Sequence, residues 1–179
     1  KKSLVIAISQ SGETADTLAA IRVAKERGAK VISIVNVMGS SIMRASHKTI
    51  LQGAGPEICV LSTKAYTSQI AILSLIAHEL AGQQEEGRSK LKELIRYIYY
   101  LTSKAMRDHI KELSERLRYT QHIYLIGRGL QHPTALEAAL KIKEVSYIHA
   151  VAYAGGELKH GTIALIDKGT PCIVFTSDR

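Results

Sequence analysis

The chain has 179 residues, of which 46% are hydrophobic and 22% charged, an ordinary composition for a globular protein with a real core. No apolar run is long enough to span a bilayer and no signal peptide is recognisable, so we predict neither a membrane contact nor secretion. The net charge of +8 suits a nucleic acid or an anionic metabolite; dispersed cations, 5% aromatic residues and the lack of a nucleic-acid motif favour the metabolite.

The chain opens with a strand, a loop and a helix. Residues 3–8 form a short apolar run, typical of a buried parallel strand, and residues 15–27 have a helical pattern that ends at Gly28. The loop between them is rich in hydroxyl groups and consists of Ser9, Gln10, Ser11, Gly12, Glu13 and Thr14. Free backbone N–H groups and the positive end of the helix dipole meet at such a turn, which makes it a site for an anion.

Two interpretations of this loop compete. Ser9, Ser11 and Thr14 can each donate a hydrogen bond to a phosphate oxygen, and Gly12 lets the backbone come close. No lysine lies in the loop, so it is not a Walker-type nucleotide loop. The simpler alternative is a helix capped by one Ser or Thr, with no ligand. Three hydroxyl groups and a glycine favour the ligand.

The following segments alternate between strand and helix patterns. The expected elements are strands at 30–35 and 48–51, helices at 42–46, 63–80 and 89–117, the last broken once, and an exposed link at 83–87. This alternation predicts an α/β fold with a mostly parallel sheet.

The two cysteines, Cys59 and Cys172, lie far apart and show no CxxC or Cys/His spacing, so neither a metal site nor a cofactor is predicted. We expect two buried, reduced thiols in a cytoplasmic protein. A second hydroxyl segment, Ser62-Thr63, follows Cys59-Val60 at the start of the helix expected over 63–80. Ser62 either caps this helix or lines the same ligand pocket as the loop over 9–14.

The second half of the chain repeats the pattern of the first. A strand at 122–126 ends in Gly127-Arg128-Gly129, a helix covers 134–147, and a strand at 171–177 again ends in hydroxyl groups. The chain starts at Lys1 without methionine, so we expect a piece of a longer protein in which each half is truncated. The expected division is a first subdomain at 1–82, a helical connector at 83–118 and a second subdomain at 119–179.

A charged cluster and a histidine make up a second candidate site. Glu137, Lys141 and Glu144 are three or four residues apart and therefore share one helix face, where a carboxylate and an ammonium could hold a proton-transfer site. The alternative is an ordinary surface ladder of charges, but the surrounding helix has little other polar surface. His160 lies between Lys159 and Gly161 and suits general acid–base chemistry because histidine titrates near neutral pH.

With these segments described, the chain resembles the isomerase part of the glutamine–fructose-6-phosphate aminotransferase family, also called glucosamine-6-phosphate synthases. The resemblance covers nearly the whole chain in the family's order, in the stretches IAISQSGETADTL, NVMGSSIMR, STKAYTSQ, LIGRG, ALEAALKIKEVSYIHA and GELKHG. SQSGET alone indicates only a sugar isomerase (SIS) domain, a phosphosugar-binding α/β fold. The stretch over 136–161 narrows the resemblance to this family.

The resemblance implies two SIS-type, flavodoxin-like subdomains, each a parallel-sheet αβα sandwich, and conversion of fructose-6-phosphate plus ammonia to glucosamine-6-phosphate. Glu144 matches the residue that moves a proton between carbons 1 and 2, Lys141 a lysine beside it, and His160 the ring-opening histidine, which in the family comes from the neighbouring subunit of a homodimer. The positions that match the family's contacts with a phosphosugar (fructose-6-phosphate, glucose-6-phosphate or glucosamine-6-phosphate) are Ser9, Gln10, Ser11, Thr14, Val60 and Ser62.

The chain departs from the family in what it lacks. The glutaminase domain, which supplies ammonia from glutamine, is absent, and the segments with a further phosphate-binding serine and the Schiff-base lysine are expected before Lys1 and after Arg179. Thr162 stands where the family usually has proline. Two other interpretations remain open: a non-catalytic phosphosugar-binding SIS regulator domain and a stand-alone phosphosugar isomerase.

Overall fold

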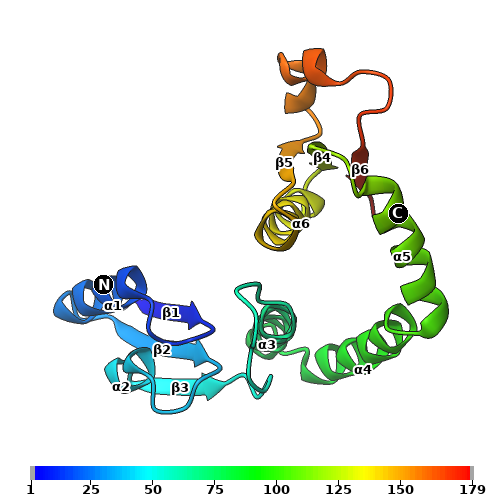
Figure 1. Cartoon of the computed structure of the whole chain (residues 1–179). Helices are drawn as coiled ribbons and strands as arrows, with labels where there is room; N and C mark the ends of the chain where they lie inside the picture. The colour runs from blue at the N-terminus through cyan, green and yellow to red at the C-terminus, as the bar shows by residue number, and fades with distance from the viewer. Residues whose placement is uncertain (1–2, 178–179) are drawn as a thin grey trace. The chain divides into compact units, whose positions relative to one another are not determined.

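The computed structural model describes residues 3–177 and divides the chain into two compact units, one up to Tyr97 and one from Ile98 onward. The boundary lies inside one helix, α4 (Gln84–Leu101), within the segment predicted as a connector (Figure 1). The division into 1–82, 83–118 and 119–179 stays a prediction, and its outer limits at 1 and 179 lie outside the described residues.

The first unit is built around a parallel sheet of three strands in the order β1-β2-β3. The strands are β1 (Leu4–Ser9), β2 (Lys30–Val35) and β3 (Lys48–Leu51). The helices are α1 (Ala15–Glu26), α2 (Ser41–Ala45), α3 (Lys64–Leu80) and the first part of α4. Because all three strands run in the same direction, their carboxyl ends meet at one edge, where open α/β sheets bind ligands.

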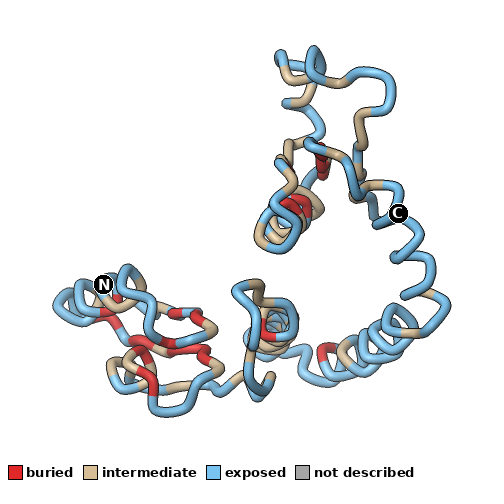
Figure 2. The backbone as a smooth tube through the Cα atoms, in the orientation of Figure 1, coloured by how far each residue is buried: buried red, intermediate tan, exposed pale blue. Residues whose placement is uncertain are grey.

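One face of this sheet holds the core of the first unit. Its buried side chains come from two strands and from both α1 and α2: Ala7, Ile21, Val31, Val35 and Ile42 (Figure 2). Side chains alternate along a strand, so Leu4, Ile6 and Ile8 of β1 lie on the opposite face, where they remain exposed.

The second unit repeats this arrangement with the strand order β5-β4-β6, again all parallel. The strands are β4 (His122–Gly127), β5 (His149–Ala154) and β6 (Cys172–Phe175). The helices are α5 (Lys104–Leu117), α6 (Gln131–Ser146) and two 3₁₀ helices, η1 (Glu157–Lys159) and η2 (Thr162–Leu165). The core joins α6 to the sheet through Ile123, Leu125, Ala135, Ala139 and Ala150.

A glycine brings β4 and α6 into direct backbone contact. A Cβ atom at Gly127 would lie 2.2 Å from the carbonyl oxygen of Gln131, the first residue of α6. No side chain can occupy that space, so only glycine allows α6 to start this close to the end of the strand.

The α/β class with parallel sheets flanked by helices is confirmed, and so is the single break in the long helical region, between Leu101 and Lys104. There Ser103 begins α5 by accepting a hydrogen bond from the Met106 N–H at 3.3 Å. Residues 83–86 are exposed as expected, but they are not a link between helices, because α4 already begins at Gln84 and buries Gly87.

Two further expectations are corrected. Strand β5 was not predicted, because half of it is alanine, a residue with little preference for strands. The two cysteines are free but exposed rather than buried, since Cys59 lies on a loop and Cys172 opens β6 at the edge of its sheet. Within residues 3–177, no helix has both the length and the apolar character needed to cross a membrane. The same residues contain no cluster of His, Cys, Asp and Glu side chains that could hold a metal ion.

Candidate active-site elements

The hydroxyl-rich loop of the first unit is held together by its own side chains. Ser9 is the last residue of β1, and its buried Oγ accepts a hydrogen bond from the Gly12 N–H at 3.0 Å. The same Oγ lies 3.0 Å from the Oγ1 of Thr14, so the two hydroxyls share a hydrogen bond. Ser11 Oγ accepts the Glu13 N–H at 3.2 Å. Gly12 has a φ of 71°, which bends the loop back toward Ser9.

None of these hydroxyl groups caps the helix that follows. Thr14 stands at the N-cap position of α1, but its side chain makes no capping hydrogen bond. The simpler alternative for this loop, a Ser or Thr cap without a ligand, therefore does not describe the geometry. The N–H groups of the first turn of α1 keep no side-chain acceptor, which leaves the partial positive charge of the helix end available to an anion.

Asn36, which sequence reasoning missed, connects two loops at the carboxyl end of the sheet. Its backbone N–H donates to the carbonyl oxygen of Gln10 at 3.1 Å. Its side chain donates to the Gly55 carbonyl at 2.7 Å and accepts the Ala54 N–H at 3.0 Å. Asn36, which follows β2, thus binds both the segment after β3 and the hydroxyl-rich loop.

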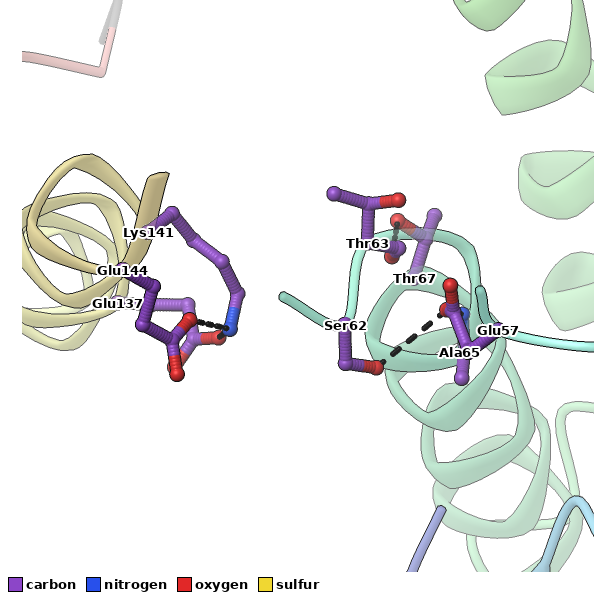
Figure 3. Close-up of polar contacts among 8 residues, drawn as sticks. All are labelled: Glu57, Ser62, Thr63, Ala65, Thr67, Glu137, Lys141 and Glu144. Carbon is purple, nitrogen blue, oxygen red and sulfur yellow. Dashed lines mark hydrogen bonds and ion pairs between the residues drawn. The ribbon is translucent and has the colours of Figure 1, made fainter. Parts of the chain in front are cut away.

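The predicted sugar-contacting segment precedes α3 and is organised by a carboxylate. Glu57 accepts hydrogen bonds from the Ala65 N–H at 2.9 Å and from the Ser62 hydroxyl at 3.4 Å (Figure 3). Glu57 therefore caps α3, and Ser62 is a donor to it rather than the cap; Val60 is exposed. Glu57 lies well before the helix and outside any capping-box spacing, so the sequence contained no signal for it.

In the second unit, α6 brings together the three charged residues expected on one face. The Nζ of Lys141 lies 2.8 Å from Glu137 Oε1 and 3.4 Å from Glu144 Oε2 (Figure 3). These side chains are 22, 27 and 26% exposed for Lys141, Glu137 and Glu144, whereas the surface pair Arg88–Glu85 is 69 and 88% exposed. The triad is therefore partly desolvated and is not an ordinary solvated ladder.

The charge state of Lys141 follows from its surroundings. Burial lowers the pKa of Lys141, but the hydrogen bond and charge of Glu137, together with Glu144, outweigh burial and raise the pKa above its usual 10.5. Because folding raises the pKa of Lys141, its protonation contributes stability that is fully present below pH 10.5 and is lost as the pH rises through the raised pKa. At neutral pH Lys141 is therefore an ammonium and not a base.

Replacement of Glu137 by glutamine is expected to lower the pKa of Lys141, because it removes the closer carboxylate while burial remains. An NMR titration of the lysine side-chain carbons, with the Lys141 signal assigned from a Lys141→Arg variant, measures this change. Glu86→Gln, which removes the partner of the exposed Lys90, is the matched control and should leave the Lys141 titration unchanged. An unaltered titration in Glu137→Gln would contradict this account of the triad.

His160 belongs neither to the hydroxyl-rich loop nor to the charged triad of α6. It directly follows the 3₁₀ helix η1, as the C-cap residue of that short helix. Its Nδ1 lies 3.2 Å from the Glu157 carboxylate, and the two side chains are 72 and 67% exposed. Among the described residues, the hydrogen bond of the His160 ring goes to Glu157 and not to Lys141 or Glu144.

Parallel α/β units with an uncapped, hydroxyl-rich loop at a helix start are typical of domains that bind anions. The family model described as the SIS domain matches residues 1–79 and 116–179, and the chain belongs to this family. The unmatched stretch contains α4 and most of α5.

Curated relatives match almost the full length of this chain but extend far beyond it. A glutamine–fructose-6-phosphate aminotransferase (isomerising) of Thermococcus kodakarensis is 47% identical over 97% of this chain and 30% of its own length. The protein of the same name from Thermotoga maritima is 48% identical over 98% of this chain and 30% of its own length. The chain thus spans about a third of the length of these relatives.

The solved structure of the C-terminal domain of glucosamine-fructose-6-phosphate aminotransferase from Francisella tularensis has the same fold. It is 40% identical to this chain and superposes with a TM-score of 0.87, covering 99% of this chain and 52% of that domain. The resemblance seen in the sequence is confirmed by these comparisons.

Proposed function

We propose that this chain is the sugar-phosphate isomerising part of a glutamine–fructose-6-phosphate aminotransferase. The observation that carries the proposal is the 47–48% identity to relatives of that name over 97–98% of the chain, which includes every candidate site segment. The substrates are fructose-6-phosphate and ammonia, the product is glucosamine-6-phosphate, and a glutaminase domain of the full-length protein supplies the ammonia.

The loop from Ser9 to Thr14 binds the phosphate in this proposal. In the described geometry its hydroxyls bond one another, and a phosphate would replace the Ser9–Thr14 hydrogen bond with bonds to its own oxygens. The uncapped start of α1 adds backbone N–H donors and a favourable dipole. Because the phosphate is remote from carbons 1 and 2, its binding energy serves to position the sugar for reaction. Gln10 completes the phosphate contacts, and Val60 and Ser62 contact the sugar.

The proton chemistry falls to the second unit. Isomerisation of a ketose to an aldose needs a base that removes a proton from carbon 1 and returns it to carbon 2. We assign this transfer to the carboxylate of Glu144, which contributes on the order of 10²–10⁴ in rate. The ammonium of Lys141 stabilises the negative charge that develops on the sugar oxygens during the transfer.

Ring opening needs a separate group, and His160 is the proposed one. Its imidazole transfers a proton between the ring oxygen and the anomeric hydroxyl, and its exposure agrees with a role in a site completed by a second subunit. The proposal therefore includes a homodimer in which His160 serves the neighbouring site. A cytoplasmic location fits the two free thiols.

Calorimetric titration with fructose-6-phosphate tests the phosphate site. Tighter binding of fructose-6-phosphate than of inorganic phosphate is expected, with a loss of about tenfold in Ser11→Ala, the size of one hydrogen bond to a charged group. Ser3→Ala, which removes a hydroxyl outside the loop, is the matched control. If the full-length protein shows no preference for the sugar phosphate, the proposed function is wrong.

A further inference from the structure

The loop proposed to bind phosphate contains a carboxylate, Glu13, and a carboxylate repels an anionic ligand. In the structure, the Glu13 carboxylate binds a neighbouring backbone N–H group. Glu13 Oε1 accepts a hydrogen bond from the backbone N–H of Ser41, the first residue of α2, at 2.8 Å. The Glu13 side chain therefore binds the next helix rather than its own loop.

Two further contacts join the same segments. The Ile42 N–H donates to the carbonyl oxygen of Gly12 at 2.8 Å, and the Ser40 side chain packs directly against the Cα of Gly12. Three consecutive residues, Ser40 to Ile42, thus contact Gly12 and Glu13. With the bond from Asn36 to Gln10, the segment that follows β2 contacts the loop at two places, Asn36 and residues 40–42.

The negative charge of Glu13 is compensated locally. Hydrogen bonds from the side chain and backbone of Ser41, helped by the nearby charge of Arg44, lower the pKa of Glu13 below its usual 4.5. Arg44 in turn donates to Ser41 Oγ at 3.0 Å and to the Gly39 carbonyl. Glu13 is therefore ionised at neutral pH, and its charge is offset by the first residues of α2 and by Arg44.

From these contacts, and resting on the proposed function, we infer that Glu13 is a positioning residue for phosphate recognition: its hydrogen bond to Ser41 fixes the loop in the conformation that receives the phosphate. In this inference the carboxylate acts through its acceptor oxygen, which holds the loop in place, and not through its charge. Glutamine offers the same acceptor oxygen and should replace it, although a neutral acceptor forms a weaker bond than a carboxylate. Alanine offers no acceptor and should not.

The test compares variants on both sides of this bond in the full-length protein. Glu13→Ala is expected to raise the KM for fructose-6-phosphate about tenfold with kcat within about twofold, because lost uniform binding changes KM alone. Glu13→Gln should stay within about threefold of the unmodified KM. Glu26→Gln, in the last turn of α1, controls for the loss of a carboxylate nearby.

Two variants of Ser41, the residue that donates this hydrogen bond, give a second and independent comparison. Ser41→Pro removes the N–H that Glu13 binds, at the first position of a helix, where proline is tolerated, and Ser40 before it has the extended backbone that proline requires. Ser41→Ala keeps this N–H and removes only the hydroxyl. Ser41→Pro should therefore match Glu13→Ala, whereas Ser41→Ala, which keeps the backbone bond and loses only the contact of the hydroxyl with Glu13, should raise the KM less than Ser41→Pro does.

Hydrogen exchange of peptides over 10–13 and 36–44 separates this inference from the proposed function. Exchange at the Ile42 N–H should rise in Glu13→Ala and not in Glu13→Gln, whatever the ligand is. If the unmodified protein fails to bind fructose-6-phosphate, the proposed function is wrong. Hydrogen exchange at the Ile42 N–H would still show whether Glu13 fixes the conformation of the loop. Equal effects of the alanine and glutamine variants, a fall in kcat at constant KM, or unchanged exchange in Glu13→Ala would overturn the inference.

Discussion

Replacement of Glu144 by glutamine is expected to slow isomerisation by about 10²–10⁴ while the affinity for fructose-6-phosphate stays within about twofold. Glutamine has the shape of glutamate but cannot accept a proton, so the transfer between carbons 1 and 2 loses its base. Lys141 remains in place because its shorter bond, 2.8 Å, goes to Glu137. The measurements, made on the full-length protein without ammonia, are solvent deuterium incorporation into fructose-6-phosphate and its conversion to the aldose phosphate, because a proton passed directly from carbon 1 to carbon 2 introduces no deuterium.

Glu115→Gln is the matched control for this prediction. Glu115 is an exposed glutamate of α5 in the same unit, paired with Arg118, and its loss should leave deuterium incorporation unchanged. Unimpaired incorporation in Glu144→Gln would exclude Glu144 as the base. An unmodified protein that binds the sugar phosphate, incorporates no deuterium and forms no aldose phosphate would instead be a non-catalytic phosphosugar-binding module.

Replacement of Gly12 by alanine is expected to reduce the free energy of unfolding by about 2–5 kcal/mol and to abolish measurable phosphosugar binding. Two costs add together. The φ of 71° is unfavourable for alanine, and the new Cβ would lie 2.1 Å from Ser40 Oγ and 2.4 Å from Ser40 Cβ. Ser40 is buried, so it has little room to withdraw. Urea denaturation followed by circular dichroism measures the loss of stability.

Two variants separate the costs of the Gly12 substitution. Gly28 has a φ of 77° with no atom within 4 Å of its ideal Cβ, so Gly28→Ala carries only the backbone cost of about 1–2 kcal/mol. A second substitution, Ser40→Gly, should restore part of the stability lost in Gly12→Ala, because it removes both atoms that the new methyl group meets. Equal destabilisation by Gly12→Ala and Gly28→Ala, with no rescue, would show that the contact with Ser40 does not matter.

Local patterns were sufficient to predict much of the fold. Strands β1, β2 and β3, the helices α1 and α3 and the break before Lys104 all follow from hydrophobic periodicity and turn residues within a short window. The same holds for parts of the candidate site. Neighbouring hydroxyls of one loop meet because they are close in sequence, and Glu137, Lys141 and Glu144 meet because helical spacing places them on one face.

Long-range partners could not be predicted in this way. Glu13 and Ser41 are 28 positions apart, and Asn36 reaches Ala54 across 18, so their contacts depend on how separate elements pack. Glu57 is only eight positions from Ala65, but its capping role depends on an irregular loop for which no periodicity exists. Exposure of the cysteines was likewise decided by their places at a loop and a sheet edge, which composition does not encode.

The close approach at Gly127 fixes the first residue of α6, a helix that also packs on the sheet through Ala135 and Ala139. The helix is anchored where Gln131 meets the strand, and Glu144 lies about 20 Å farther along at 1.5 Å per residue. A tilt of about 5° at the anchored end would carry the Glu144 carboxylate through about 1.7 Å, more than the displacement of about 1 Å that can slow a reaction a hundredfold. Gly127, at the end of β4 and about 20 Å from Glu144, thus helps to determine the position of the proposed base, because its missing side chain fixes where α6 begins.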